Sequence, residues 1–281
     1  MTRLTASTLG APDEDLDAVV DALARSHVTH VELRVSGGQI VDPAMTAREV
    51  AGVRSRFDAA GISISGLASY VRIASDAGDE MVVGALAEAL RFASDLGAPV
   101  VRVFPGAPTH PSDYSAVPRL REEAGVADER AVRRLDAVAG LAGDLGVSPV
   151  LETHDSHPRG ADILRILERV SGPIGAVWDL MHPWRVGEPL ETTWGLLQPW
   201  IDGDRGSVQV KDANLPGDAT PVEIGRGTVP TAEFGALLHG AEFDGTVCLE
   251  WERTWYPEAL PLSDALVSAR AWFDRYFEEG A

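Results

Sequence analysis

Short runs of β-forming residues alternate with longer amphipathic segments along the whole chain. In the longer segments, apolar residues recur at the i, i+3, i+4 and i+7 spacing of a helix, and Gly61, Gly97 and Gly146 stand where three of them end. The runs that predict strands cover residues 4–9, 30–35, 63–69, 99–104, 149–154, 175–180, 207–212 and 246–251. Eight strand–helix units in 281 residues give about 35 residues per unit. This pattern predicts an α/β protein with a (β/α)8 or TIM-barrel fold.

An open, doubly wound sheet explains the same pattern less well. Such a sheet usually needs fewer strands and often carries a glycine-rich phosphate-binding turn, which this sequence lacks. No linker, low-complexity tract or change of composition marks a second domain, so we expect a single barrel domain over residues 1–281. The longest irregular segments, residues 105–120 and 213–230, each follow a predicted strand and are expected on the catalytic face.

Charge and cysteine content exclude several classes of protein. The chain has 24 Lys and Arg against 43 Asp and Glu, a net charge of -19, which disfavours nucleic acid and anionic membranes as partners. Its one cysteine, Cys248, excludes an intramolecular disulfide or a cysteine-based zinc cluster. No apolar run reaches the roughly 18 residues of a transmembrane helix, and the first residues lack the apolar core of a signal peptide. We therefore expect a cytoplasmic protein.

Oxygen-bearing residues end four successive predicted strands. Glu152, Asp179, Gln209 and Glu250 are 27, 30 and 41 residues apart, each close to one strand–helix unit. In a barrel, such strand ends point into one site. Converging carboxylates repel unless a cation neutralises them, and carboxylate and amide oxygens suit Mg²⁺ or Mn²⁺. The alternative is that these are solvated residues paired with nearby arginines.

Basic residues at strand ends suggest how a substrate is held. Arg34, Arg72 and Arg102 end early strands or follow them, and arginine binds phosphate or carboxylate in a bidentate way. They predict an anionic sugar or sugar acid, although neutralisation of Glu32 and other local acids explains them equally well. Arg226, in the segment GRGTVP, is a further possible anion contact.

Two residues share a strand face with the predicted ligands. His154 follows Glu152 by two residues, so it is expected to point inward and to contact the substrate or a ligand. Lys211 follows Gln209 by two residues and could hold the substrate or a glutamate.

Three other residues are assigned structural roles. Asp212 is expected to cap its loop or to orient Lys211. We expect His110 and His157 to be solvated in loops.

The segments LETHD, WDLMHPW, VQVKDA and CLEWE, with the earlier HVELR and the later GRGTVPTAEF, carry a family resemblance. Together they resemble the metal-dependent sugar isomerases and epimerases of the xylose isomerase-like barrels. That family includes ketose 3-epimerases, hydroxypyruvate isomerase, inosose dehydratase and endonuclease IV-type enzymes. The resemblance implies that Glu152, Asp179 and Glu250 bind a divalent metal, Mn²⁺ or Mg²⁺ with Zn²⁺ or Co²⁺ as second choices. Gln209 stands where the family usually has a histidine ligand.

The resemblance also implies a chemistry. His182 matches a histidine that usually contacts substrate in the family. Glu152 and Glu250 would form the acid/base pair of an isomerase or epimerase, whose reaction proceeds through an enediolate. The substrate would be a small sugar or sugar phosphate, and a homo-oligomer is possible. A lyase that dehydrates a keto-sugar or keto-inositol is the first alternative. A non-catalytic barrel subunit is the second, because of Gln209. An endonuclease is disfavoured by the acidic charge and the few histidines.

Overall fold

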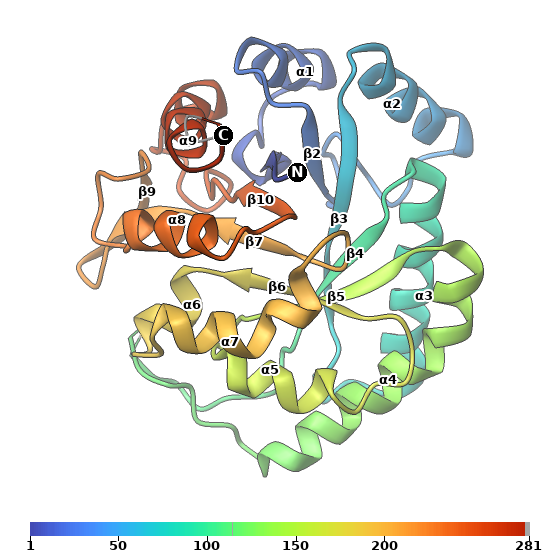
Figure 1. The fold of residues 1–281 in the computed structure, drawn as a ribbon. Helices are drawn as coiled ribbons and strands as arrows, with labels where there is room; N and C mark the ends of the chain where they lie inside the picture. Colours follow the sequence, from blue (N-terminus) through green and yellow to red (C-terminus); the bar gives the residue numbers. More distant parts are fainter. Residues whose placement is uncertain (114, 279–281) are drawn as a thin grey trace.

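The computed structural model describes residues 1–113 and 115–278, and these form a closed barrel of parallel strands (Figure 1). Around the barrel, the strands follow the order β1, β10, β7, β6, β5, β4, β3, β2 and back to β1. They are β1 Arg3–Ser7, β2 His30–Arg34, β3 Ser63–Arg72, β4 Val100–Phe104, β5 Ser148–Glu152, β6 Gly175–Asp179, β7 Ser207–Val210 and β10 Thr246–Leu249. The predicted α/β barrel is confirmed.

Helices surround the barrel and cover its outer face (Figure 1). They are α1 Leu16–Arg25, α2 Ala47–Ala59, α3 Asp79–Leu96, α4 Ala124–Leu145, α5 Gly160–Leu167, α6 Met181–Arg185, α7 Leu190–Ile201, α8 Thr231–Gly240 and α9 Leu262–Phe277, with a 3-10 turn η1 at Thr8–Gly10. The apolar core lies between strands and helices. In it, the ring of Trp178 on β6 lies 4.8 Å from that of Phe234 on α8 and 6.4 Å from that of Trp194 on α7. Within the described ranges, no helix is long and apolar enough to cross a membrane.

Local sequence signals explain where several helices begin and end. Thr46 and Glu49 form a capping box at the start of α2, which satisfies otherwise unpaired backbone N–H groups. The helices α3 and α4 end at Gly97 and Gly146, whose φ angles are 79° and 65°. These left-handed conformations favour glycine because it has no Cβ, and they confirm the ends predicted from the sequence.

Of the two segments that were expected to be irregular, one contains regular structure. Residues 105–120 form a loop with an isolated bridge between Thr109 and Leu120, while Tyr114 lies outside the described residues. Residues 213–230, expected to be irregular, contain part of an antiparallel hairpin of β8 (Asp212–Asn214) and β9 (Asp218–Val222). The hairpin was missed because its strands are short and the segment is rich in proline and glycine, which usually mark loops.

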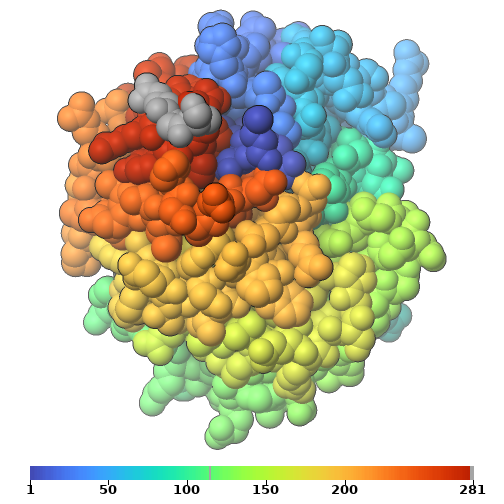
Figure 2. Space-filling model, viewed as in Figure 1, coloured from blue at the N-terminus to red at the C-terminus, as the bar shows by residue number. Residues whose placement is uncertain are grey.

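The first and last strands close the barrel. Residues 3–6 of β1 pair in register with residues 246–249 of β10. In the space-filling view, the blue N-terminal and the orange-to-red C-terminal segments accordingly lie side by side (Figure 2). Closure leaves the carboxyl ends of all eight barrel strands at one mouth, where active sites of this architecture lie.

Candidate functional site

Four neighbouring strands bring the predicted oxygen-bearing residues together. Glu152 and Asp179 are the last residues of β5 and β6, Gln209 lies within β7, and Glu250 follows β10 directly. All four are buried. Glu152, Asp179 and Glu250 each offer one carboxylate oxygen within 4.8 Å of the others. We call these four residues the carboxylate cluster.

Gln209 joins the cluster through its amide. On β7 it is paired with Asp179 of β6 on one side and with Cys248 of β10 on the other. Its Nε2 donates a hydrogen bond of 3.2 Å to Glu250 Oε1. This bond turns the amide nitrogen toward Glu250 and leaves the amide oxygen available to a cation.

Two buried cations compensate part of the negative charge. Arg102 of β4 donates from Nη1 to Glu152 Oε2 at 2.9 Å and to Glu250 Oε1 at 3.4 Å. Lys211 Nζ lies 2.6 Å from Glu250 Oε2 and 2.8 Å from Asp179 Oδ2. The pairing of the acids with nearby basic residues, considered as an alternative to a metal, is therefore present in part.

Two oxygens of the cluster nevertheless lack a partner. Glu152 Oε1 and Gln209 Oε1 are buried and accept no hydrogen bond from any residue that the structure describes, whereas Asp179 Oδ2 has the Lys211 ammonium as its partner. Leaving buried polar atoms unsatisfied costs about 1–3 kcal/mol each. Together with the carboxylates of Asp179 and Glu250, these two oxygens form an all-oxygen donor set of the kind that a hard divalent cation prefers.

The charge count agrees with such an ion. Glu252, partly buried, adds a fourth carboxylate, since its Oε1 lies 2.8 Å from Lys211 Nζ. When ionised, the three carboxylates of the cluster and Glu252 carry four negative charges, against the two positive charges of Arg102 and Lys211. This surplus of negative charge favours a bound cation, and the buried Glu32, which also interacts with Arg102, adds to it. The residues present therefore fit the metal that the sequence predicted.

Burial and crowding change the acidity of Glu152. Burial raises its pKa to about 8, the Glu250 carboxylate adds to the shift, and Arg102 opposes it. Without a further cation, Glu152 therefore holds a proton near neutral pH. A carboxyl group with such a pKa is suited to exchange protons at the operating pH.

Two histidines stand beside the cluster. His154 follows β5 and His182 lies on α6, and their rings are 4.5 Å apart. His182 Nε2 lies 3.7 Å from Asp179 Oδ2, while its Nδ1 accepts a hydrogen bond from Arg185 Nε. With Glu152, the two histidines form a second group of possible metal ligands.

The two imidazoles differ in protonation. Burial lowers the pKa of His182 well below its usual range, and the neighbouring His154 adds to the shift. Burial opposes protonation of His154 as well, but the Asp155 and Glu152 carboxylates outweigh it and raise the pKa of His154. His154 is therefore the imidazole that more readily carries a proton at this mouth.

Arg34 ends β2, on the side of the barrel opposite to β6 of the carboxylate cluster. Its Nε donates to Tyr70 Oη at 2.6 Å, and its guanidinium carbon lies 5.4 Å from the ring centroids of both Tyr70 and Trp255. In the described part of the chain, no ion pair joins Arg34 to Glu32, the partner suggested as an alternative. Cation–π contacts therefore hold this guanidinium.

The other predicted anion contacts, Arg226 and Arg72, are exposed, whereas the cluster is buried. The loop of Arg226 is fixed by Asp212, whose carboxylate accepts hydrogen bonds from the backbone N–H groups of residues 225, 227 and 229. Asp212 thus caps its loop.

Sequence reasoning missed three residues near the site. Glu252 follows Glu250 by two residues, so the alternation along an extended segment could have revealed it. Tyr70 lies near the end of β3, which extends three residues past the predicted strand. Asp155 accepts a backbone hydrogen bond from Gly106, in the loop after the neighbouring strand β4, a contact that no local pattern signals.

The expectation for His157 was wrong. It is buried, its Nε2 lies 3.0 Å from Asp128 Oδ1, and its Nδ1 lies 2.8 Å from Ser156 Oγ. The polar partners come from α4 and from the adjoining residue, and only the first depends on long-range packing. His110 is exposed, as expected.

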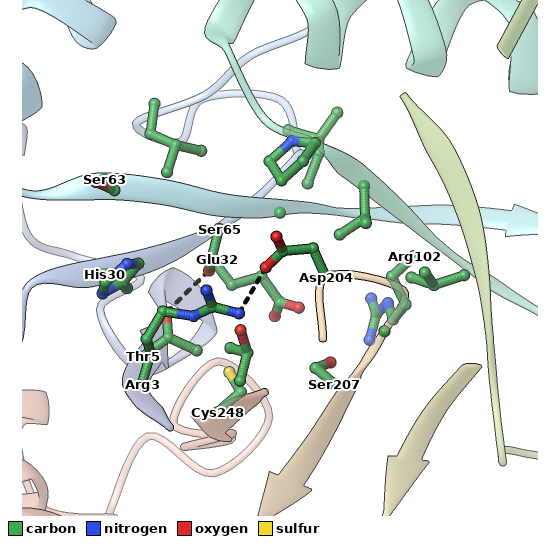
Figure 3. A pocket seen from close by; sticks show the side chains of 18 of the residues that line it. Arg3, Thr5, His30, Glu32, Ser63, Ser65, Arg102, Asp204, Ser207 and Cys248 are labelled. Atoms are coloured by element: carbon green, nitrogen blue, oxygen red, sulfur yellow. Dashed lines mark hydrogen bonds and ion pairs between the residues drawn. The ribbon is translucent and has the colours of Figure 1, made fainter. Parts of the chain in front are cut away.

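A separate cavity of about 330 Å³ opens at the amino ends of the strands (Figure 3). Its lining includes Glu32, whose Oε1 has no hydrogen-bond partner among the described residues and whose pKa is raised by burial. Arg102 also lines it and so lies between this cavity and the carboxylate cluster. Because catalysis in this architecture takes place at the carboxyl ends of the strands, the cluster is the candidate active site.

Comparison with known proteins gives a consistent result. Residues 20–276 match the sequence model of a family described as xylose isomerase-like TIM barrel. No curated protein sequence matches the chain.

Solved structures superpose over nearly the full length. A D-tagatose 3-epimerase-like protein shares 19% identity over 98% of this chain and 97% of that chain, with a TM-score of 0.75. The probable 3-DHS dehydratase AsbF of Bacillus anthracis shares 16% identity over 96% of this chain and 97% of that chain, with a TM-score of 0.72. A zinc-bound IolI protein shares 15% identity over 98% of this chain and 99% of that chain, with a TM-score of 0.75. Identities this low show a common fold.

Proposed function

The chain belongs to the xylose isomerase-like TIM-barrel family, and from that premise we propose that it is a divalent-metal-dependent isomerase or epimerase of a small sugar or sugar phosphate. Structural neighbours that are named as sugar epimerases support this reaction class. The single observation that carries the proposal is the convergence of three buried carboxylates, from Glu152, Asp179 and Glu250, beside the unpartnered oxygens Glu152 Oε1 and Gln209 Oε1.

The metal would be held by the carboxylate cluster. Glu152, Asp179, Gln209 and Glu250 supply oxygen donors, which favour Mn²⁺ or Mg²⁺, with Zn²⁺ or Co²⁺ as alternatives. A bound divalent ion would polarise the substrate carbonyl and increase the acidity of the neighbouring C–H bond.

Glu152 and Glu250 would move the proton. They come from β5 and β10, which are separated in the barrel by β6 and β7, so they approach the barrel axis from different directions. Removal of the proton next to the carbonyl gives an enediolate. Return of a proton to the opposite face of the same carbon gives epimerisation, and return to the neighbouring carbon gives aldose–ketose isomerisation.

The remaining polar residues at the mouth would orient the substrate. His154, His182 and Lys211 line the cluster and can bond to hydroxyl groups, while Arg34 presents a cation held by aromatic rings. Arg102 is engaged by Glu152 and Glu250, so its contribution is to hold these two carboxylates in place. Arg226, on its exposed loop, would contact substrate only if the loop lies over the mouth when substrate is bound.

A screen of ketoses, aldoses and sugar phosphates with Mn²⁺ and with Mg²⁺ tests the proposal. We expect conversion that chelator abolishes, and loss of turnover in Glu152→Gln and Glu250→Gln with the fold intact by circular dichroism. Unchanged activity in either variant would remove that residue from the acid/base pair.

Dehydration is the second candidate, because one structural neighbour is named as a probable dehydratase. The same enediolate could expel a β-hydroxyl from a keto-sugar or keto-inositol. Reaction in D₂O separates the two: an epimerase or isomerase incorporates deuterium without loss of water, whereas a dehydratase yields an unsaturated product. A non-catalytic barrel would bind no metal in purified form.

A further inference from the structure

Lys211 occupies an unusual position for a residue expected to contact substrate. Its side chain is 3% exposed, and its Nζ lies within 2.8 Å of oxygens of Asp179, Glu250 and Glu252. An ammonium group has three N–H donors, so three carboxylates can hold it at once. The cation therefore lies inside the carboxylate cluster and not at its rim.

The lysine and a metal ion would need the same atom. Asp179 Oδ1 accepts a hydrogen bond of 2.7 Å from the backbone N–H of Met181, so Oδ2 is the oxygen that remains for a metal. Asp179 Oδ2 is also the atom 2.8 Å from Lys211 Nζ. An ammonium group and a divalent ion on one oxygen would lie only a few ångströms apart in a buried site, where charges of like sign repel strongly.

Glu252 offers the ammonium group another partner. It lies outside both groups of possible metal ligands, yet its Oε1 is 2.8 Å from Lys211 Nζ. Its side chain is 19% exposed, against 0% for Asp179 and 5% for Glu250. A short movement of the flexible lysine side chain toward Glu252 would free Asp179 and Glu250 while keeping the ammonium paired.

We propose that Lys211 is a resident counter-cation of the carboxylate cluster, that metal binding displaces its ammonium group from Asp179 and Glu250 and leaves it paired with Glu252 alone, and that this exchange sets the metal affinity. The proposal rests on the metal site of the proposed function and assigns Glu252 a positioning role.

The test is a titration of Mn²⁺ and of Mg²⁺ by calorimetry, with no substrate, on the full chain. We expect Lys211→Met to tighten metal binding about 10-fold, because the competing cation is gone, and Glu252→Gln to weaken it about 10-fold. In the double variant, Glu252→Gln should have an effect of less than about 2-fold, because Glu252 acts through Lys211. Glu258→Gln, an exposed residue of the same C-terminal loop, controls for the loss of one negative charge.

Several outcomes overturn the displacement. The displacement is refuted if Lys211→Met binds metal no more tightly than wild type does. It is also refuted if Glu252→Gln weakens metal binding by the same factor whether residue 211 is lysine or methionine. If Lys211→Met does not fold, the comparison of Glu252→Gln with Glu258→Gln decides, since equal affinities contradict the proposal and weaker binding in Glu252→Gln alone supports it. Absence of binding in wild type and in every variant would instead refute the metal site of the proposed function. Binding in wild type without any effect of Lys211 would refute the displacement alone.

Discussion

The two halves of the barrel present different chemistry at the same mouth. Strands β5, β6, β7 and β10 end in the carboxylate cluster with Glu252 and Lys211. Strands β2 to β4 contribute Arg34 and Arg102 together with the rings of Tyr70 and Phe104. The second half thus holds the acids that fit a metal, and the first half holds cations stabilised by aromatic rings.

Arg102 is the contact between the halves. It starts on β4, its guanidinium lies 4.1 Å from the ring centroid of Phe104, and it donates to Glu152 and Glu250 of the other half. Arg34, by contrast, bonds to Tyr70 and stays within the first half except for its contact with Trp255. Two arginines of similar burial therefore have different tasks, and the comparison predicts different costs for losing them.

Replacing Arg102 should have the largest effect. Arg102→Met leaves buried carboxylates without their cation, and removing one partner of a buried ion pair typically costs about 3–5 kcal/mol. Arg34→Met, the matched control, loses one hydrogen bond and two cation–π contacts and should cost about 1–2 kcal/mol. Urea unfolding in the presence of chelator measures both free energies.

A metal ion should reverse part of this difference. Added Mn²⁺ supplies positive charge to the carboxylate cluster, so it should restore more stability to Arg102→Met than to Arg34→Met. Equal losses in the two variants, or equal recovery with Mn²⁺, would mean that the two halves are not energetically distinct.

The next largest effect should be the pH dependence of stability that Glu152, in the second half, causes. The pKa of Glu152 is raised from 4.5 to about 8 in the folded, metal-free protein, so the folded state binds more protons than the unfolded state between these values. The stability that this group contributes is fully present below pH 4.5 and is lost as pH rises toward 8, with a slope of at most about 1.4 kcal/mol per pH unit. Urea unfolding across this range should show the decline in wild type.

The control for the pH effect is Glu152→Gln. Glutamine does not titrate, so this variant should lose the part of the decline that Glu152 causes. A wild-type stability that rises over the same range, or a slope that the substitution leaves unchanged, would contradict the raised pKa of Glu152.

The barrel and the carboxylate cluster could be predicted because each depends on regular spacing. Strand ends recur about once per unit, so Glu152, Asp179, Gln209 and Glu250 follow from counting along the chain. The partners of the cluster could not be predicted in this way. Arg102 reaches Glu250 across 148 positions of sequence, and which of several arginines does so depends on packing inside the closed barrel. His157 was misjudged for the same reason, since Asp128 lies 29 positions away on α4.

Gln209 should give the smallest effect, and its replacement tests directly whether this residue of the second half binds the metal. Its amide oxygen is a neutral, hard donor, whereas an imidazole nitrogen binds transition metals more strongly. Gln209→His should therefore tighten Zn²⁺ and Co²⁺ binding about 10-fold and change Mg²⁺ binding little, because Mg²⁺ prefers oxygen. Competition titrations with these ions measure the selectivity, and Cys248→Ala, a neighbouring inward-facing change on β10, controls for altered packing. If Zn²⁺ affinity does not change in Gln209→His, residue 209 is not a ligand and the metal rests on the three carboxylates alone.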